Sequence, residues 1–275
     1  MHPEIIETVK RALAEDIGTG DLTSQMTVPA DRQAEGKFYA RAAITVAGIE
    51  LLPLIFELRG GVDHLELLKQ PGDQAYDGEL IAVVKGNARR LLECERVALN
   101  FMQRLSGVAT LASKYVAAVA GTRTKVLDTR KTTPGLRRLE KAAAAAGGVT
   151  NHRMGLFDYV LIKNNHITAA GGVRQALAGT AGATVPVEVE VRTWEELNEA
   201  LDAGAKRLLI DNLTPAEAKR WVDYVAGRAS IEISGGVTLD TIGAYAEAGA
   251  DYISVGAITH SAVAVDLNFR VTLLG

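Results

Sequence analysis

From about residue 125 the chain repeats one pattern, in which a short, uncharged, β-branched run is followed by a helical segment. Such runs are typical of strands buried in a parallel sheet. From residue 185 on, the unit recurs every ~20–25 residues, the spacing of βα repeats in a barrel or a doubly wound sheet. The pattern therefore predicts an α/β fold with strands at 125–129, 159–163, 185–191, 207–211, 230–234 and 251–255.

The helices of this repeat carry start and stop signals. Thr193 precedes Glu196 and Thr214 precedes Glu217 at the capping-box spacing. Thr238 is expected to open a third helix. Each helix should end near a glycine, which readily takes the left-handed backbone conformation found after helices; these are Gly204, Gly227 and Gly249.

The first hundred residues differ from the repeat. We expect an amphipathic helix at 3–16, a polar turn at 15–24, a strand at 36–47 and a short apolar helix at 49–58. The stretch LELLKQPGDQAYDGELIAVVKG alternates strand and turn signals, and 88–105 is again helical. This order indicates a separate α+β domain.

Composition narrows the class of protein. The net charge of −3 over 275 residues argues against a nucleic-acid binder that works through bulk positive charge. The single cysteine, Cys94, allows no intrachain disulfide and fits a reducing cytosol, where we expect a small buried residue. The N-terminal segment does not resemble a secretory signal, and no apolar run reaches the ~18 residues of a membrane span. We therefore expect a cytoplasmic protein.

In parallel α/β folds, functional sites form at the carboxyl ends of the strands. The segment VPVEVEV places Glu188 and Glu190 on one face of its strand, because side chains alternate. Carboxylates that point into a barrel need partners, whereas the plainer alternative puts one of them at a solvated edge. Cations gather near the first two strands. They are Arg130, Lys131, Arg137, Arg138, His152, Arg153 and Lys163.

These cations predict a pocket for a small polyanion, since arginine binds carboxylate and phosphate bidentately. The alternative is surface charge from unrelated loops. Ser234-Gly235-Gly236 before the helix expected near Thr238, and Gly256-Ala257 after the last strand, add a phosphate site built from backbone N–H groups. Together with inward carboxylates suited to sugar hydroxyls or magnesium, they indicate a phosphosugar substrate.

Long ordered motifs resemble those of the quinolinate phosphoribosyltransferase family. They are EDIGTGDLTS, RLSGVAT, DTRKTTPGLR, NHRMGLFDYVLIKNNHI, EVEV, LLIDN, SGG and DYISVGAITHS. The resemblance implies an N-terminal α+β sandwich domain, residues 1–104 joined by the tail 266–275. It is followed by an open, incomplete α/β barrel of fewer than eight strands, residues 105–265. It also implies a homodimer or higher homo-oligomer with shared active sites.

The implied reaction is a decarboxylating transfer of phosphoribose from phosphoribosyl pyrophosphate to quinolinate, with Mg²⁺ bound to the pyrophosphate. By the resemblance, quinolinate is bound by Arg130, His152 and Arg153, with Lys131 and Lys163 beside them and Arg104 from the neighbouring subunit. Ribose and metal are held by Glu190 and Asp211, and the 5′-phosphate by Ser234, Gly235, Gly236 and Gly256. The catalytic set is Lys131, Lys163, Glu190 and Asp211. Asn164 departs from the family, where many relatives carry an acid.

Three other functions compete with this one. A related phosphoribosyltransferase of molybdenum-transport operons would share the ribose and phosphate residues, but the dicarboxylate set of Arg104, Arg130, His152 and Arg153 favours quinolinate. Lys131 or Lys163 could serve as the Schiff-base lysine of an aldolase, although such chemistry does not require so many arginines. A lipoyl-type carrier would need a lysine at the hairpin tip near Asp77-Gly78, and the sequence has none there.

Overall fold

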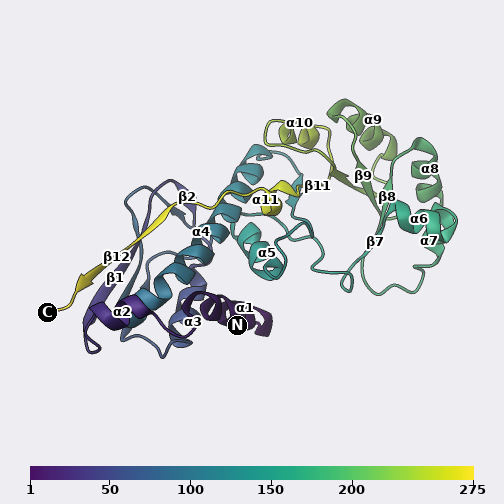
Figure 1. Ribbon diagram of the computed structural model, residues 1–275. Helices are drawn as coiled ribbons and strands as arrows, with labels where there is room; N and C mark the ends of the chain where they lie inside the picture. The colour runs from purple at the N-terminus through teal and green to yellow at the C-terminus, as the bar shows by residue number, and fades with distance from the viewer. The chain divides into compact units, whose positions relative to one another are not determined.

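The computed structural model describes all 275 residues and divides them into two compact units (Figure 1). Unit 1 comprises 1–113, 132–148 and 259–275, and unit 2 comprises 114–131 and 149–258. Helix α4 (Ala88–Ala118) contributes to both units and runs without interruption through residues 104 and 105.

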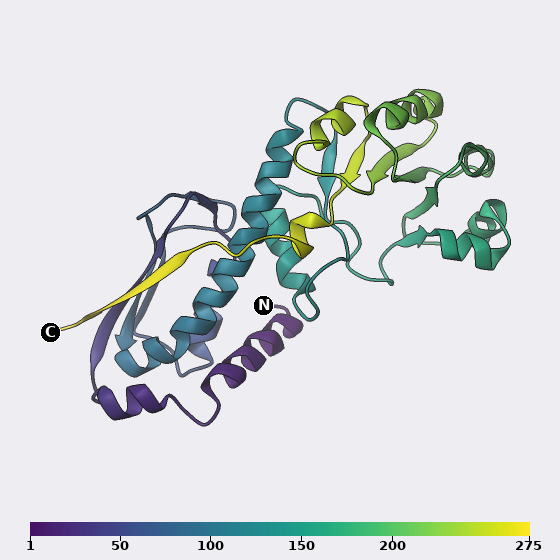
Figure 2. The same ribbon diagram turned by 45° about the horizontal axis from the view of Figure 1, so that its top comes forward.

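Unit 1 is built on an antiparallel sheet with the strand order β12-β1-β5-β3. Its strands are β1 (Gln33–Ala40), β3 (His64–Leu67), β5 (Leu80–Asn87) and β12 (Leu267–Leu273). Strand β12 comes from the C-terminal end of the chain and pairs with β1 along its whole length, from Ala34↔Leu273 to Ala40↔Leu267. Helix α4 lies across one face of this sheet in both ribbon views (Figures 1 and 2).

Short elements complete unit 1. They are α1 (Pro3–Ile17), α2 (Leu22–Thr27), β2 (Ile44–Thr45), the 3-10 turn at Ile49–Leu51, α3 (Leu52–Glu57), β4 (Gln74–Ala75) and α5 (Arg137–Ala146). The strand expected at 36–47 is thus divided between β1 and β2. The polar turn expected at 15–24 runs into α2, because Asp21 accepts the backbone N–H of Ser24 at 3.0 Å and caps that helix.

Cys94 lies on the buried face of α4, with no exposed surface. Burial raises the pKa of its thiol to about 12, because the thiolate would lose its hydration. The prediction of a small buried residue is confirmed, and the thiol is chemically inert at neutral pH.

Unit 2 contains a six-stranded parallel sheet in the order β6-β11-β10-β9-β8-β7, which is not closed. The strands are β6 (Lys125–Leu127), β7 (Val160–Ile162), β8 (Val187–Val191), β9 (Arg207–Asp211), β10 (Ser230–Ser234) and β11 (Tyr252–Ser254). Each falls within a strand predicted from the sequence. The fold class is therefore confirmed: an α+β domain with its own sheet, followed by an open, incomplete α/β barrel.

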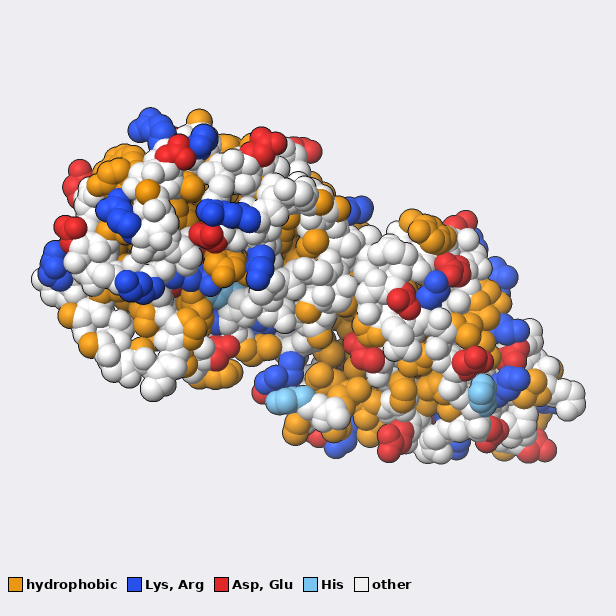
Figure 3. Space-filling view, turned by 180° about the vertical axis from the view of Figure 1, so that it is seen from behind, with side chains coloured by type: hydrophobic (Ala, Val, Ile, Leu, Met, Phe, Trp, Pro, Cys, Tyr) orange, Lys and Arg blue, Asp and Glu red, His pale blue; other side chains and the backbone are white.

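Helices follow the strands of unit 2, and Figure 1 shows α8, α9 and α10 on one side of the sheet. They are α6 (Asn164–Ala170), α7 (Val173–Ala178), α8 (Trp194–Asp202), α9 (Pro215–Val225) and α10 (Ile242–Glu247), with α11 (Ala257–His260) after the last strand. No helix combines the length and apolar character needed to cross a bilayer. Acidic and basic side chains are interspersed over the face shown in Figure 3.

The predicted helix starts are right at two positions and wrong at the third. The hydroxyl of Thr193 accepts the N–H of Glu196 at 3.2 Å, and Thr214 forms a complete capping box with Glu217. Thr238 does not open a helix. Its N–H donates to the hydroxyl of Thr241 at 3.0 Å, so residues 238–241 form a turn and α10 begins after it.

Candidate active site

A cavity of about 660 Å³ opens at the carboxyl ends of the unit 2 strands. Most of the residues predicted for the site line it: Arg130, Lys131, His152, Arg153, Lys163, Glu190, Asp211 and Ser234. They meet because parallel strands present their carboxyl ends at one edge of the sheet. On β9, Asp211 pairs with Ser234 of β10, and Leu209 pairs with Glu190 of β8.

Glu190 and Asp211 form a pair of carboxylates that lines this cavity. Glu190 Oε2 lies 4.0 Å from Lys163 Nζ, and Asp211 Oδ2 accepts a hydrogen bond from the Asn212 amide at 2.6 Å. The pKa of Glu190 is raised, first by burial and further by the charge of Asp211, although Lys163 opposes both. The cations of the chain therefore do not fully neutralise this pair, which can accept hydroxyl donors or a cation.

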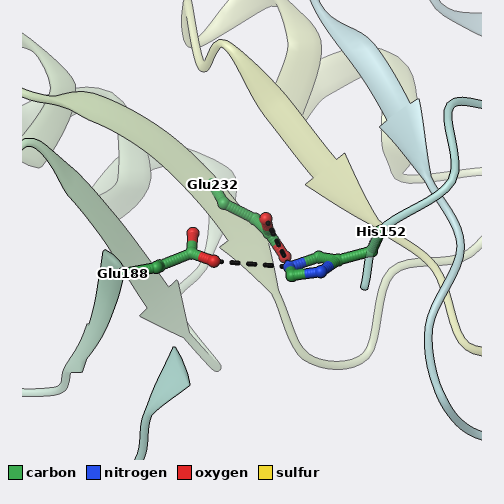
Figure 4. A group of neighbouring side chains, drawn as sticks. All are labelled: His152, Glu188 and Glu232. Carbon is green, nitrogen blue, oxygen red and sulfur yellow. Dashed lines mark ion pairs between the residues drawn. The ribbon is translucent and has the colours of Figure 1, made fainter. Parts of the chain in front are cut away.

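A second pair of carboxylates, Glu188 and Glu232, is fully buried beneath the cavity. His152 Nε2 lies 3.3 Å from one oxygen of each, as Figure 4 shows. Arg207 closes the group from β9: its Nε is 3.0 Å from Glu188 Oε1 and its Nη2 is 2.6 Å from Glu232 Oε2. Tyr159 adds a hydroxyl 3.2 Å from Glu188.

This buried cluster resembles a metal site in its ligand types, because the ligand atoms of His152, Glu188 and Glu232 lie within 4.8 Å of one another. The Arg207 guanidinium, however, already donates to both carboxylates. The cluster is therefore an ion-pair network that carries its own cation. Burial by itself would lower the pKa of His152, but its hydrogen bonds and charge interactions with the two carboxylates outweigh burial and raise that pKa to about 9.

The loop that carries His152 is fixed by Asp128 at the end of β6. Asp128 Oδ1 accepts the backbone N–H of His152 at 2.8 Å, and its Oδ2 accepts the Asn151 amide at 2.6 Å. The next residue, Arg153, has a lowered pKa because of burial and because Arg130 is near. Two cationic side chains therefore lie near each other in this part of the cavity.

Lys163 is fixed at the end of β7 by the first turn of α6. Its backbone N–H donates to His166 Nδ1 at 2.9 Å, which closes a capping box around the start of the helix. The side chain of Lys163 extends from this fixed backbone into the cavity. His166 therefore fixes the backbone from which the Lys163 side chain extends.

Gly235 follows β10 where the backbone approaches the loop after β9. A Cβ at this position would lie 2.3 Å from Asn212 Oδ1 and 2.7 Å from Asn212 N, and φ is +93°. Only glycine fits there. The expected phosphate cradle at a helix N-terminus needs correction, because α10 starts at Ile242 rather than near Thr238. The backbone of the Ser234–Gly236 turn remains at the cavity edge without a helix directly behind it.

Two family models cover the chain. The model described as "Quinolinate phosphoribosyl transferase, N-terminal domain" matches residues 21–106, and that described as "Quinolinate phosphoribosyl transferase, C-terminal domain" matches residues 108–270. The chain belongs to the quinolinate phosphoribosyltransferase family.

Relatives of this family match the chain over its length. A probable nicotinate-nucleotide pyrophosphorylase [carboxylating] of Bacillus subtilis is 40% identical over 275 residues, which are 99% of this chain and 95% of that protein. The chloroplastic nicotinate-nucleotide pyrophosphorylase [carboxylating] of Arabidopsis thaliana is 40% identical over 98% of this chain and 84% of its own. The crystal structure of NadC from Streptococcus pyogenes superposes with a TM-score of 0.94 at 36% identity, covering 100% of this chain and 99% of that one.

Arg104, which the family resemblance assigns to a neighbouring subunit's site, lies on α4 in unit 1. Its guanidinium donates to Glu140 Oε1 from Nε at 3.0 Å and from Nη2 at 2.7 Å, and its Nη1 donates to the Ala262 carbonyl at 2.6 Å. Glu140 is fully buried. Within one chain Arg104 thus neutralises a buried carboxylate, and its role across a subunit boundary stays a prediction.

Two of the expected cations, Arg137 and Arg138, have contacts within unit 1. Arg138 pairs with Glu4 at 2.7 Å in unit 1, and Arg137 donates to the hydroxyl of Thr132. The partner that sequence reasoning missed is Arg207, at the opposite end of its strand from the expected site. Arg192 was also missed, although it lines the cavity.

Proposed function

We propose that this chain transfers phosphoribose from phosphoribosyl pyrophosphate to quinolinate and releases pyrophosphate and CO₂, giving nicotinate mononucleotide for NAD biosynthesis. The observation that carries this proposal is the division of charge in one cavity. Arg130, Arg153 and His152 form a cationic part suited to a dicarboxylate. Glu190 and Asp211 form an anionic part suited to ribose hydroxyls. The family membership and the relatives' names support the same substrates.

The geometry supports binding of the acceptor through its two carboxylates. Burial and the nearby charge of Arg130 both lower the pKa of Arg153, so a bound dicarboxylate would meet favourable charge from both arginines. His152 is held over Glu188 and Glu232 and presents its ring beside these arginines. This fixed arrangement orients the pyridine ring before any bond changes.

The bond changes place charge where the site has counter-charge. The ring nitrogen attacks ribose C1′ as the bond from C1′ to pyrophosphate breaks, and positive charge builds on the sugar. Glu190 and Asp211 stabilise that charge electrostatically. The nitrogen, now cationic, stabilises the electron pair that stays on the adjacent ring carbon when the carboxylate on that carbon departs as CO₂, and a proton then binds to that carbon. Lys131, Lys163 and ordered water are the candidate donors.

Magnesium belongs to this proposal with Glu190 and Asp211 as its protein ligands. The fit rests on the donor set, because both residues offer carboxylate oxygens, the type that Mg²⁺ prefers. Their mutual charge also raises the pKa of Glu190, so a cation between them would be favoured. When bound, the ion neutralises negative charge on the pyrophosphate leaving group.

We include a homo-oligomer and a cytoplasmic location in the proposal. Leu156 and Phe157 are each 76% exposed in the loop before β7, the strand at one open edge of the sheet. Exposed apolar side chains beside an unpaired strand edge favour association with another protein surface. The lone buried cysteine suits a reducing compartment.

A direct assay tests the reaction. The purified chain is incubated with quinolinate, phosphoribosyl pyrophosphate and Mg²⁺, and nicotinate mononucleotide and CO₂ are followed together; nicotinate replaces quinolinate in the control. We expect product from quinolinate and none from nicotinate. If phosphoribosyl pyrophosphate binds but quinolinate yields no product, the proposal is wrong and the same ribose-phosphate site serves another acceptor.

A further inference from the structure

Strand β8 and the residue after it carry charges whose exposure rises from the buried network toward the mouth of the cavity. Glu188 and Glu190 lie on one face of the strand, Arg192 follows its last residue, and the three side chains are 0%, 12% and 45% exposed. Alternate residues on a strand are about 6.6 Å apart. The three charged groups therefore differ in depth, with the cation just beyond the end of the strand as the most exposed of them.

The contacts of Arg192 leave its charge available to a ligand. Its Nη2 donates to the amide oxygen of Asn164, a neutral group, at the cavity. Its acidic partner, Glu196, lies 3.5 Å from Nη2 in a half-exposed pair. The other oxygen of Glu196 accepts the Arg192 backbone N–H at 2.7 Å, so Glu196 is engaged at the start of α8. Exposed pairs of this kind neutralise little charge.

We propose that Arg192 binds the pyrophosphate group of the phosphoribosyl donor at the mouth of the cavity. This inference rests on the proposed function and names a residue for the leaving-group end of the same site. The rise in exposure from Glu188 to Arg192 supports it: His152 sits over Glu188, which puts the acceptor deepest, and Glu190 follows at the level of the ribose. The next level outward, occupied by Arg192, is where a leaving group departs to solvent.

The neighbours of Arg192 strengthen the assignment. Lys163 reaches the cavity from β7 beside Asn164 and lies 4.0 Å from Glu190. Lys163 and Arg192 thus flank the Glu190 level with two cations. A group that carries several negative charges can use both, with the planar guanidinium giving two parallel hydrogen bonds and the ammonium a point charge.

The test measures binding of inorganic pyrophosphate with Mg²⁺ by calorimetry, alongside binding of quinolinate alone. Arg192→Gln removes the charge, and we expect pyrophosphate affinity to fall about tenfold while quinolinate affinity stays within about twofold. Arg192→Lys keeps the charge but loses the two parallel hydrogen bonds of the guanidinium, so the affinity for pyrophosphate should fall about threefold. Lys219→Gln, which removes an exposed cation from α9, is the matched control and should change neither affinity.

Asn164 provides a second, independent variant. Asn164→Asp places a carboxylate against the guanidinium, and we expect weaker pyrophosphate binding, in the direction of Arg192→Gln. Asn164→Ala removes the same hydrogen bond without adding charge and should have the smaller effect. In steady-state assays the Arg192→Gln variant should raise KM for phosphoribosyl pyrophosphate more than it lowers kcat.

Two results would overturn the inference. One is an unchanged pyrophosphate affinity in Arg192→Gln, which would leave Arg192 as the partner of Glu196 only. The other is a selective loss of quinolinate affinity, which would move Arg192 to the acceptor end. Pyrophosphate binding does not depend on which acceptor reacts. If the unsubstituted protein does not convert quinolinate, the proposed function is wrong. If Arg192→Gln still lowers the affinity for pyrophosphate in that case, this inference holds.

Discussion

Two pairs of carboxylates on the same sheet face differ in how far cations of the chain neutralise them. Glu188 and Glu232 are fully buried, and the chain supplies cations for both through Arg207 and His152. Glu190, only two residues from Glu188, has a single lysine at 4.0 Å and a raised pKa. The comparison teaches that inward carboxylates on a parallel sheet do not by themselves indicate a ligand. What matters is whether the fold already provides the counter-charge.

The largest effect should come from removing the internal cation of the buried pair. Arg207→Met leaves Glu188 and Glu232 desolvated with only His152 between them. Breaking one partner of a buried ion pair costs about 3 kcal/mol or more, and we expect the free energy of unfolding to fall by that amount in urea titrations. Lys219→Met, which breaks an exposed pair with Asp223, should cost less than about 0.5 kcal/mol. A loss below about 1 kcal/mol in Arg207→Met would mean that the network adds little to stability.

The pair formed by Glu190 and Asp211 should affect activity rather than stability. Glu190→Gln should lower kcat/KM about 100-fold, because a charge that stabilises the developing positive ribose is lost. Its free energy of unfolding should stay within about 0.5 kcal/mol. The matched variant Glu188→Gln, two residues earlier on the same face, should mainly lose stability. Equal stability losses in the two variants would remove the distinction between the pairs.

The smallest effect is a pH dependence that belongs to the buried network alone. The pKa of His152 is raised to about 9 in the folded chain, against about 6.5 when unfolded. The imidazolium therefore contributes its full stabilisation below about pH 6.5, and this contribution is lost as the pH rises through about 9. Unfolding free energies measured from pH 6 to pH 8, below the range in which the Cys94 thiol of the unfolded chain ionises, should fall by on the order of 2 kcal/mol. The decline should be absent in His152→Asn, and a decline of the same size in that variant would assign it to another group.

Much of the fold could be predicted because its signals are local. The strands of unit 2 are short β-branched runs, and the Thr193 and Thr214 caps depend on residues three positions apart. The predicted helix start at Thr238 was wrong because threonine also occurs in turns. The Thr238 N–H donates to the hydroxyl of Thr241 within such a turn. The division of 36–47 into two strands was also missed, since the break depends on pairing with distant segments.

The site was predictable only where it follows the strand ends. The sequence places Lys163, Glu190 and Asp211 there, and they do line one cavity. Arg207 was missed because it stands at the first position of β9. The register brings it beside Glu188, since Leu208 pairs with Val189. A long side chain can reach inward from the far end of a strand, and a search limited to carboxyl ends cannot find it.

Cys94 has a practical consequence for experiments on this chain. The thiol is buried against Ile55, with a pKa raised to about 12, and the sequence contains no other cysteine. A maleimide or nitroxide reagent at neutral pH therefore has no native target in the folded protein. A cysteine introduced at an exposed position such as Lys219 can be labelled alone, without first deleting the native one. Donor- and acceptor-labelled batches could then be mixed to follow association and exchange between copies by energy transfer.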